Sequence, residues 1–509
     1  MENAENKPAG QKNPLVSSNY SKLEQFFENK QLWLLCAITI LAFVIRAYYL
    51  AITQSQPIWW DEGEYLSAAK HWALGTQYDI NQQRQPLFPL LLAVFLKIGI
   101  SSEPILKFLV VLLPAVASVV LLYLFAREVS DKRTAIISSF LLAIFWTHIF
   151  WTNRFSTDIT GFAFTLLAYF SLWKFYSSRQ NKWLYVMGAS LGLGFLTRIG
   201  GVIPLFIIIA FLLVAENLSL LKKYWVISGL IAFATVLPYL VWNKLHHGAI
   251  FAFFPGYFDA VHAAEKLSHP IAWWVFNYFY QYNGLVFFLL FLLGLISFAN
   301  LFLGADILIK NKDTHLRKDL FLLLSIVLPV VFFVFIERNA EDRWIFAMVP
   351  AIFIVVSKGL GYVQDFLAKY NKPLAACVVM ALLAIGAYWE LSQAEASIKF
   401  KKDSYAPVKY AGLWMKEHSS KGDVIFTNSV PQMSYYSERK INSVPGASTF
   451  EQDVARLKPK YLVLSLFDAS VPVAYKYPEK YPNMLIPVQA YFADAAQKQA
   501  TLIIYEFKY

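Results

Sequence analysis

The stretch Trp59-Trp60-Asp61-Glu62-Gly63-Glu64-Tyr65 follows closely on an apolar run, residues 32–52, that is long enough to cross a bilayer. It places three carboxylates within four residues at the expected membrane boundary. Acidic groups are costly to desolvate there, so they indicate a functional site. The two tryptophans suit the headgroup layer, where amphipathic rings settle. The stretch therefore predicts an acidic site held beside the membrane surface.

The composition is that of a polytopic membrane protein. The 509 residues are 57% hydrophobic and 16% charged, with a mean hydropathy of +0.45, whereas soluble domains carry about 25% charged residues. The net charge is +11, and the lysines and arginines lie mostly in short loops between apolar runs. Because no basic run is interleaved with polar recognition residues, we expect no nucleic-acid partner. Cys36 and Cys377 both fall in apolar runs and predict neither a disulfide framework nor a zinc site.

Apolar runs recur along the first 395 residues. They predict about 11 membrane-spanning helices, near residues 32–52, 105–127, 134–151, 159–176, 183–196, 201–214, 224–242, 285–309, 320–336, 344–360 and 374–391. The apolar segment 86–100 is shorter and opens with Pro86 and Pro89. We expect it at the interface or in a re-entrant position, and not as a crossing.

The positive-inside rule orients these spans. With the N-terminus inside, five basic loops are cytoplasmic: Lys132/Arg133, Arg179/Lys182, Lys222/Lys223, Lys310/Lys312/Arg317/Lys318 and Lys369/Lys372. Counting segment 86–100 as a crossing would place Asp158 on the opposite face from Asp61. The orientation therefore predicts both aspartates on the outer, extracytoplasmic face of the cell membrane.

Three parts follow from this pattern. Residues 1–30 are polar and predict a disordered cytoplasmic tail, and residues 31–395 form the membrane domain. Residues 396–509 are charged and have no apolar run of span length, so they predict a small α/β domain on the outer face. We expect a helix at 406–417 and strands at 424–427, 461–466, 485–491 and 501–507.

Asp61 is the first catalytic candidate. The alternative is that it N-caps a helix at 62–74, with Glu64 as its capping-box partner. Capping needs neither Glu62 nor the tryptophans, so Glu62 is also a candidate. Asp158 follows Ser156 and Thr157 at the start of a predicted span, where any of these three residues would make an N-cap. Two aspartates facing one cleft could act as base and orienting group, or could share a divalent cation.

Four arginines are expected on the outer face, where basic residues are the minority: Arg84, Arg154, Arg198 and Arg343. Arginine matches the oxygens of a phosphate in bidentate fashion, which makes these residues candidate phosphate ligands. The alternative is snorkelling at the interface. Arg46, late in the first span, is expected to snorkel or to pair with an outer carboxylate. Histidines of the loop 243–283, such as His262, show no tight metal-ligand spacing, so a resident metal stays unassigned.

Taken in order, these motifs resemble the GT-C membrane glycosyltransferases, most closely the branch of the protein O-mannosyltransferases and the aminoarabinose transferases that modify lipid A. The resemblance rests on Trp-x-Asp-Glu-x-x-Tyr (residues 59–65), Arg84-Gln85-Pro86, Asp158, Thr197-Arg198-Ile199-Gly200, Arg343-Trp344-Ile345-Phe346 and the polar C-terminal part. Gln85 stands where these relatives carry lysine, and Arg84 is expected to take over its phosphate contact.

The resemblance implies a GT-C catalytic domain at 31–395 that uses a polyprenyl-phosphate-linked sugar as its donor. The acceptor would be a protein, a glycolipid or a lipid-linked glycan, and membrane lipids would surround the site. Arginines would stabilise the lipid-phosphate leaving group, and Asp61 would act as base or positioning group. The competing hypotheses are a lipid or glycan transporter or flippase, which typically shows repeats and polar groups near the midplane, and a non-catalytic membrane scaffold. The sequence shows no repeat, and its unusual charges are predicted at one face.

Overall fold

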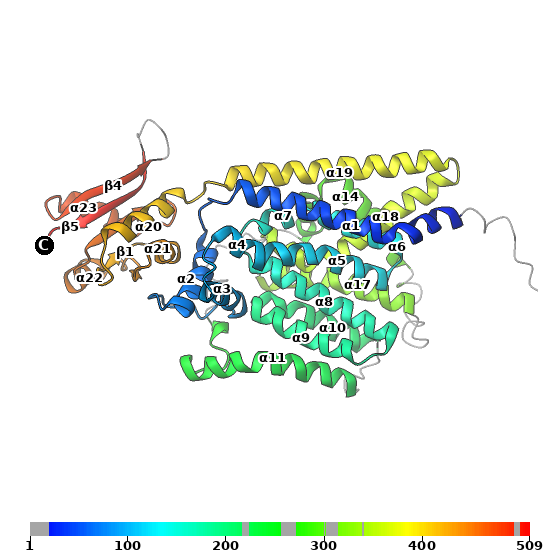
Figure 1. Ribbon diagram of the computed structural model, residues 1–509, viewed down its shortest axis with the longest axis horizontal. Coiled ribbons are helices and arrows are strands. Elements are labelled where there is room, and N and C mark those ends of the chain that lie inside the picture. Colours follow the sequence, from blue (N-terminus) through cyan, green and yellow to red (C-terminus); the bar gives the residue numbers. More distant parts are fainter. Residues whose placement is uncertain are drawn as a thin grey trace, which may run out of the picture.

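The computed structural model describes residues 20–215, 223–255, 271–299, 301, 314–337, 341–492 and 499–509. It consists of a long helical bundle and a smaller C-terminal part beyond one end of that bundle (Figure 1). The first half of the bundle contains α1 (Tyr20–Ile52), α2 (Trp60–Leu74), α3 (Leu87–Lys97), α4 (Glu103–Lys107), η1 (Phe108–Leu112), α5 (Leu113–Val129), α6 (Lys132–Ile144), α7 (Trp146–Thr152), α8 (Thr157–Ser178), α9 (Lys182–Thr197), η2 (Ile199–Val202), α10 (Ile203–Ala215) and α11 (Lys223–His247).

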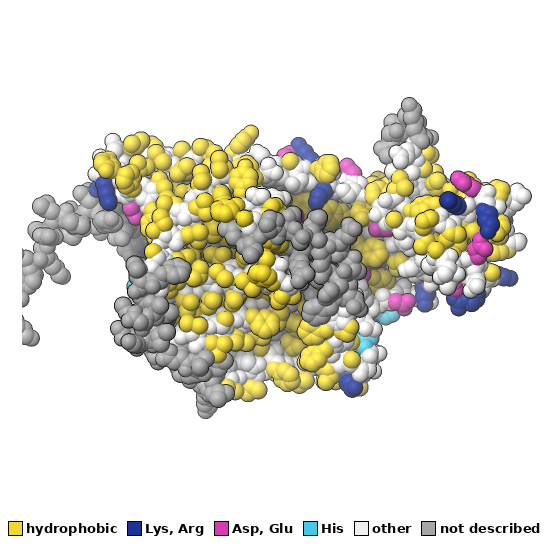
Figure 2. All heavy atoms as spheres, turned by 180° about the vertical axis from the view of Figure 1, so that it is seen from behind, with side chains coloured by type: hydrophobic (Ala, Val, Ile, Leu, Met, Phe, Trp, Pro, Cys, Tyr) yellow, Lys and Arg dark blue, Asp and Glu magenta, His cyan; other side chains and the backbone are white. Residues whose placement is uncertain are grey.

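The second half of the bundle contains α13 (Ile271–Trp273), η3 (Trp274–Tyr278), α14 (Phe279–Gly294), η4 (Leu295–Phe298), α17 (Thr314–Phe332), η5 (Phe333–Glu337), η6 (Asp342–Ala347), α18 (Val349–Ala368) and α19 (Lys372–Lys401). Hydrophobic side chains cover the bundle on the face in Figure 2, and charged side chains gather over the C-terminal part. A bilayer would solvate such an apolar surface, whereas water would not.

Seven helices in the described part of the chain are long and apolar enough to cross a membrane: Lys30–Ile52, Glu103–Val129, Trp225–His247, Phe276–Phe298, Thr314–Ile336, Val349–Ala368 and Lys372–Lys401. An eighth would be α6 with α7, which meet at a bend of 52°. The predicted count of about 11 spans is therefore not confirmed. Helices do form at 159–176, 183–196 and 201–214, but α9 and α10 have only 16 and 13 residues, and α8 carries Asp158 and Lys174.

Two sequence boundaries differ from the structure. The first helix begins at Tyr20, inside the segment predicted to be a disordered tail, and α19 continues to Lys401, past the predicted boundary at 395. The segment predicted not to cross forms α3, whose 11 residues reach only about half the thickness of a bilayer core. Residues 1–19 lie outside the described part of the chain.

The break between α6 and α7 falls at Phe145, whose backbone is extended. On one side of the break, Glu390 of α19 accepts a hydrogen bond from the Trp146 amide at 2.9 Å. On the other, Arg46 of α1 donates to the carbonyl of Ala143 at 2.9 Å. Charged side chains from two other helices therefore satisfy the backbone groups that the break leaves open.

This contact corrects the expectation for Arg46. Its side chain is fully buried, and besides carbonyl oxygens it contacts Nδ1 of His148 at 2.6 Å. It neither snorkels nor pairs with an outer carboxylate. The carbonyls of the broken helix supply the partners that a buried guanidinium needs.

The C-terminal part contains α20 (Ala406–His418), β1 (Ile425–Phe426), α21 (Val430–Ser437), β2 (Ile441–Asn442), α22 (Phe450–Leu457), β3 (Tyr461–Ser465), α23 (Pro472–Lys480), β4 (Leu485–Phe492) and β5 (Ala500–Phe507). Its sheet has the order β2-β1-β3-β5-β4, parallel between β2, β1 and β3 and antiparallel beyond. Alternate residues of β3 face opposite sides: Val463 packs with α20, and Leu462 packs with α22 and α23. Helices therefore cover both faces of the sheet.

The C-terminal part packs on α2 through α21. A Cβ atom on Gly63 would lie 2.8 Å from backbone atoms of Pro431 and Gln432, so only glycine permits this approach. Ser67 donates a hydrogen bond to the Pro431 carbonyl at 3.0 Å, and the Ile58 amide donates to the Tyr436 hydroxyl at 3.0 Å. The helix that carries the acidic motif is thus held between the bundle and the C-terminal part.

Candidate active site

The start of α2 decides which of its carboxylates are available for other contacts. The N-cap residue is Trp59, and Glu62 accepts a hydrogen bond from its amide at 2.7 Å. The capping interpretation of Asp61 is therefore wrong, because Glu62 makes the capping contact and Asp61 lies inside the first turn.

Asp61 lies between two of the predicted phosphate ligands. Its Oδ1 is 2.5 Å from Nη2 of Arg84, and its Oδ2 is 2.9 Å from Nη1 of Arg343. All three side chains remain about a quarter exposed. The structure thus brings together residues 61, 84 and 343, which are far apart in the sequence.

These ion pairs set the charge of the group. Burial alone would raise the pKa of Asp61, but Arg84 and Arg343 outweigh it and hold the pKa well below its ordinary value. The same contacts raise the pKa of Arg343 despite its burial. Asp61 is therefore an anion at every physiological pH while both arginines stay on it, and in that state it is a poor base.

Arg84 has a second carboxylate partner that the sequence analysis overlooked. Its Nε pairs with Glu64, a buried residue that also accepts hydrogen bonds from Asn81 at 3.0 Å and from the Trp60 indole at 3.2 Å. Glu64 had been considered only as a capping partner. The spacing of Glu64 from Asp61 fits a capping box. Only the fold shows that the Glu64 side chain points toward Asn81 and Arg84, in the loop before α3. Glu64 fixes the orientation of the Arg84 guanidinium.

Asp158 occupies the first turn of α8. Ser156 is the N-cap and accepts from the Asp158 amide at 3.1 Å, so Asp158 itself is not the cap. Its carboxylate is buried, forms an ion pair with Arg198 and lies 3.9 Å from Nη1 of Arg343. Arg343 therefore lies between the two aspartates, which had been predicted to share one face.

Glu62 and Arg154 form a separate pair. Both are almost completely buried and lie 3.2 Å apart. Arg154 also donates to the Pro57 and Lys401 carbonyls, at 2.8 and 3.1 Å, and its guanidinium lies 3.8 Å from the Trp59 ring centre. Because both side chains are buried and fully engaged, these contacts favour a structural role for Glu62 and Arg154 over the predicted catalytic and phosphate-binding roles. Removing one partner of a buried ion pair strongly destabilises a protein.

A cavity of about 430 Å³ opens beside these groups. Both Asp61 and Asp158 line it, together with Arg343 and three tryptophans, Trp59, Trp60 and Trp151. This volume lies within the range of about 300–1,000 Å³ that is usual for ligand pockets. The cavity holds the acidic and basic groups that a transfer reaction needs.

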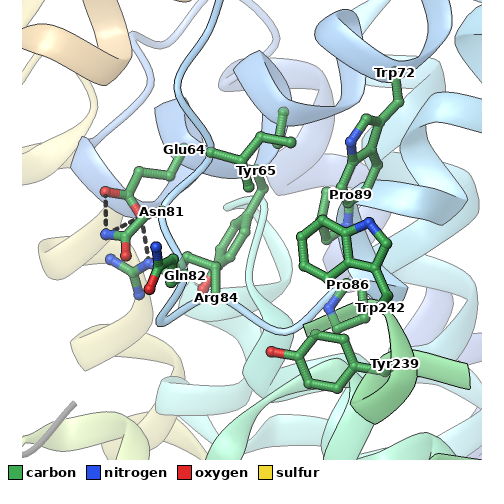
Figure 3. Close-up of a pocket in the computed structure, with 12 residues that line it drawn as sticks. Glu64, Tyr65, Trp72, Asn81, Gln82, Arg84, Pro86, Pro89, Tyr239 and Trp242 are labelled. Carbon is green, nitrogen blue, oxygen red and sulfur yellow. Dashed lines mark hydrogen bonds and ion pairs between the residues drawn. The ribbon is translucent and has the colours of Figure 1, made fainter. Parts of the chain in front are cut away.

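A second, narrow pocket of about 20 Å³ lies on the other side of Arg84. Figure 3 shows Glu64 and Asn81 grouped with Arg84, while Trp72, Pro86, Pro89, Tyr239 and Trp242 form the opposite, aromatic side. Arg84 thus lines an aromatic slot between α2, α3 and α11 and forms an ion pair with Asp61, which lines the acidic cavity.

The described residues contain no group of three or more His, Cys, Asp or Glu side chains that could hold a metal ion. Asp61 and Asp158 each face arginines. Of the loop histidines, His246 stacks on Trp242 with ring centres 4.9 Å apart, whereas His262 lies outside the described residues. A cation shared by the two aspartates stays a prediction.

Comparison with known proteins finds one family model and several solved structures that are similar to this chain. Residues 83–242 match the family model of dolichyl-phosphate-mannose-protein mannosyltransferases. That segment contains Arg84, Arg154, Asp158 and Arg198. No curated protein sequence matches the chain significantly.

Solved structures share the fold at low sequence identity. The oligosaccharyltransferase of Archaeoglobus fulgidus has a TM-score of 0.62 and 16% identity, covering 87% of this chain and 70% of its own. ArnT from Cupriavidus metallidurans, bound to undecaprenyl phosphate, has a TM-score of 0.60 and 13% identity, covering 91% and 97%. The mycobacterial arabinofuranosyltransferase AftD has a TM-score of 0.55 and 10% identity, covering 93% and 40%.

The fold is therefore that of the GT-C membrane glycosyltransferases, and the resemblance drawn from the sequence motifs is confirmed. The predicted enzyme class, a glycosyltransferase, is that of the matching family and of each of these structures. With seven apolar helices, the chain is an integral membrane protein. No match supports the transporter hypothesis.

Proposed function

We propose that this protein transfers a sugar from a polyprenyl-phosphate-linked donor to an acceptor on the extracytoplasmic face of the cell membrane. The observation that carries the proposal is Asp61 held between Arg84 and Arg343 on the wall of the cavity. A similar fold that binds undecaprenyl phosphate, ArnT, supports a lipid phosphate as the donor's leaving group. The charge pattern of the loops supports the outer face.

The reaction needs a nucleophile, a departing phosphate and a place for one proton. An acceptor oxygen attacks the anomeric carbon, the bond from that carbon to the phosphate oxygen breaks, and polyprenyl phosphate leaves with the electron pair. Arg84 and Arg343 stabilise the charge that develops on the phosphate. The acceptor's proton passes to Asp61, while Asp158, fixed by Ser156 and Arg198, orients the sugar or the acceptor.

Donor binding changes the state of Asp61. In the structure, both oxygens of Asp61 are paired with arginines. A phosphate that binds Arg84 and Arg343 competes for the same donors, because charge-assisted bonds to phosphate are bidentate at arginine. The released carboxylate regains basicity at the step that needs a base.

The test uses the full-length protein in nanodiscs with a panel of polyprenyl-phosphate hexoses and pentoses. Release of polyprenyl phosphate and transfer to envelope glycolipids are measured by mass spectrometry. Asp158→Asn should reduce release strongly. The control is Asp365→Asn, which removes a half-exposed carboxylate paired with Arg133. A protein that releases no polyprenyl phosphate from any donor would contradict the proposal.

Orientation is tested separately. A cysteine introduced at Ser404, on the cavity wall, should react with a membrane-impermeant maleimide in intact cells. Labelling only after permeabilisation would place the site on the cytoplasmic face.

A further inference from the structure

The turn that joins α19 to α20 forms part of the cavity wall. Phe400, Lys401, Ser404 and Tyr405 line the same cavity as the two aspartates. None of these four residues belongs to a motif that the sequence analysis selected. The turn lies where the bundle meets the C-terminal part (Figure 1).

The turn is fixed from both sides. Arg154 donates a hydrogen bond to the Lys401 carbonyl at 3.1 Å, and the Lys401 ammonium lies 5.4 Å from the Trp59 ring centre. On the other side, the Tyr405 ring lies 5.1 Å from that of Phe467, just after β3. The turn is therefore held against the start of α2 and against the carboxyl end of β3.

Phe400 is 85% exposed at the end of the apolar helix Lys372–Lys401, as aromatic rings at a membrane boundary commonly are. What sets it apart is that it lines the cavity. Tyr405 has φ +67° and ψ +15°, the left-handed conformation that favours glycine or asparagine. A strained backbone on a cavity wall, as at Tyr405, is a feature of a ligand site.

The chemistry of the cavity indicates which ligand it fits. Aromatic rings from Trp60, Phe400 and Tyr405 line the cavity, and carboxylates line it beside them. The C–H face of a sugar ring packs on such surfaces, while its hydroxyl groups donate hydrogen bonds to carboxylates.

We propose that the α19–α20 turn is the acceptor wall of this cavity and that the acceptor is a carbohydrate hydroxyl, on either a soluble or a lipid-borne glycan. This inference rests on the proposed transferase function and names the substrate that receives the sugar. Phe400 and Tyr405 stack on the acceptor ring, and Lys401 holds the adjoining Trp59 in place.

The test compares two reactions of one enzyme. The full-length protein in nanodiscs receives a polyprenyl-phosphate hexose, and its hydrolysis by water is measured beside transfer to three probes: methyl glycosides with short oligosaccharides, a lipid-linked glycan, and a Ser/Thr peptide. Phe400→Ala and Tyr405→Gly should raise KM for a sugar acceptor and lower the ratio of transfer to hydrolysis about tenfold. The matched control is Tyr388→Ala, which removes a ring that is 76% exposed on the same helix and does not line the cavity.

The outcomes separate the hypotheses. Transfer to oligosaccharides or to the lipid-linked glycan that depends on Phe400 supports the acceptor wall, and the better probe identifies its source. Transfer to the peptide alone overturns the carbohydrate assignment. Equal losses of hydrolysis and transfer in Phe400→Ala, or no change in their ratio, overturn the wall's role while leaving the transferase proposal intact. A wild-type protein with neither reaction for any donor overturns the proposed function and the wall together.

Discussion

Asp61→Asn should bind polyprenyl phosphate more tightly than the wild-type protein while turning over more slowly. Asp61 occupies one donor group of Arg84 and one of Arg343, at 2.5 and 2.9 Å. A lipid phosphate must displace this carboxylate before it can use both arginines. Removing the charge therefore removes a competitor, although it also removes the proposed base.

The magnitude follows from these two contacts. Hydrogen bonds to charged groups contribute about 1.5–3 kcal/mol each. If the lipid phosphate no longer has to break one such hydrogen bond, its affinity rises about tenfold, because each 1.4 kcal/mol is about a factor of ten. Repulsion between Asp61 and the phosphate would add to this gain, but solvent screens it because the Asp61 side chain is 29% exposed. Turnover should fall by about 10²-fold or more if Asp61 takes the proton.

The assay measures binding and chemistry on the same samples. Wild-type protein, Asp61→Asn and the Asp365→Asn control are placed in nanodiscs, and undecaprenyl phosphate is titrated by microscale thermophoresis. Product release is then followed with saturating donor, and thermal unfolding confirms that each variant is folded. A folded Asp61→Asn protein whose affinity for the lipid phosphate is unchanged or weaker would refute the displacement argument. Near-normal turnover would refute the catalytic role.

Three further results are expected. Arg84→Gln should weaken binding of the lipid donor by about 10- to 100-fold. Arg84→Lys should restore only part of this affinity, because an ammonium group lacks the planar, bidentate guanidinium. Full affinity of Arg84→Lys in a donor titration would indicate that Arg84 only snorkels. The pKa of Asp61 is lower in the folded protein than in the unfolded chain, where it is about 3.9. The ionised carboxylate therefore stabilises the fold fully above about pH 3.9, and this stabilisation is lost as the pH falls from there through the lower pKa of the folded state. The difference in Tm between wild type and Asp61→Asn should therefore stay constant from about pH 5 to 8 and shrink below about pH 4, and a change near neutral pH would point to another group. Gly63→Ala should cost about 1–3 kcal/mol of unfolding free energy, because its Cβ would lie 2.8 Å from the Pro431 backbone. The control Gly229→Ala has open space and lies inside α11, so it should be neutral or stabilise by up to about 1 kcal/mol. Equal effects of the two substitutions in denaturant titrations would argue against the close contact between α2 and α21.

Much of the secondary structure could be predicted because apolar runs and alternation report burial directly. Strands at 424–427, 461–466, 485–491 and 501–507 coincide with β1, β3, β4 and β5 within a few residues. The break at Phe145 could not be predicted, because neither proline nor glycine marks it. Its cause lies in Arg46 and Glu390, which reach it from other helices.

In the candidate site, too, the sequence predicts which residues are present but not which contacts they make. Residue type and expected orientation predict Asp61, Asp158, Arg84 and Arg343 as candidates, and the structure brings these four side chains together. The partners of each group depend on how α2 is rotated about its own axis, and sequence spacing does not report that rotation. Glu62 therefore looked catalytic and Glu64 looked like a cap, whereas Glu62 makes the capping contact and Glu64 fixes Arg84.

The buried Arg46 has a consequence for how the protein is made. The first span carries this charge into the translocon, although its carbonyl and histidine partners are 96 to 102 residues further along the chain. An arginine at the centre of an inserting helix costs about 2.5–3.5 kcal/mol, and Arg46, late in the span, costs less than that. At about 5–20 residues per second the ribosome needs roughly 5–20 s to supply that distance. The strongly apolar remainder of α1 must hold the helix in the bilayer during this interval. The partners of Arg46 become available once α6 and α7 have been synthesised, before the second half of the bundle.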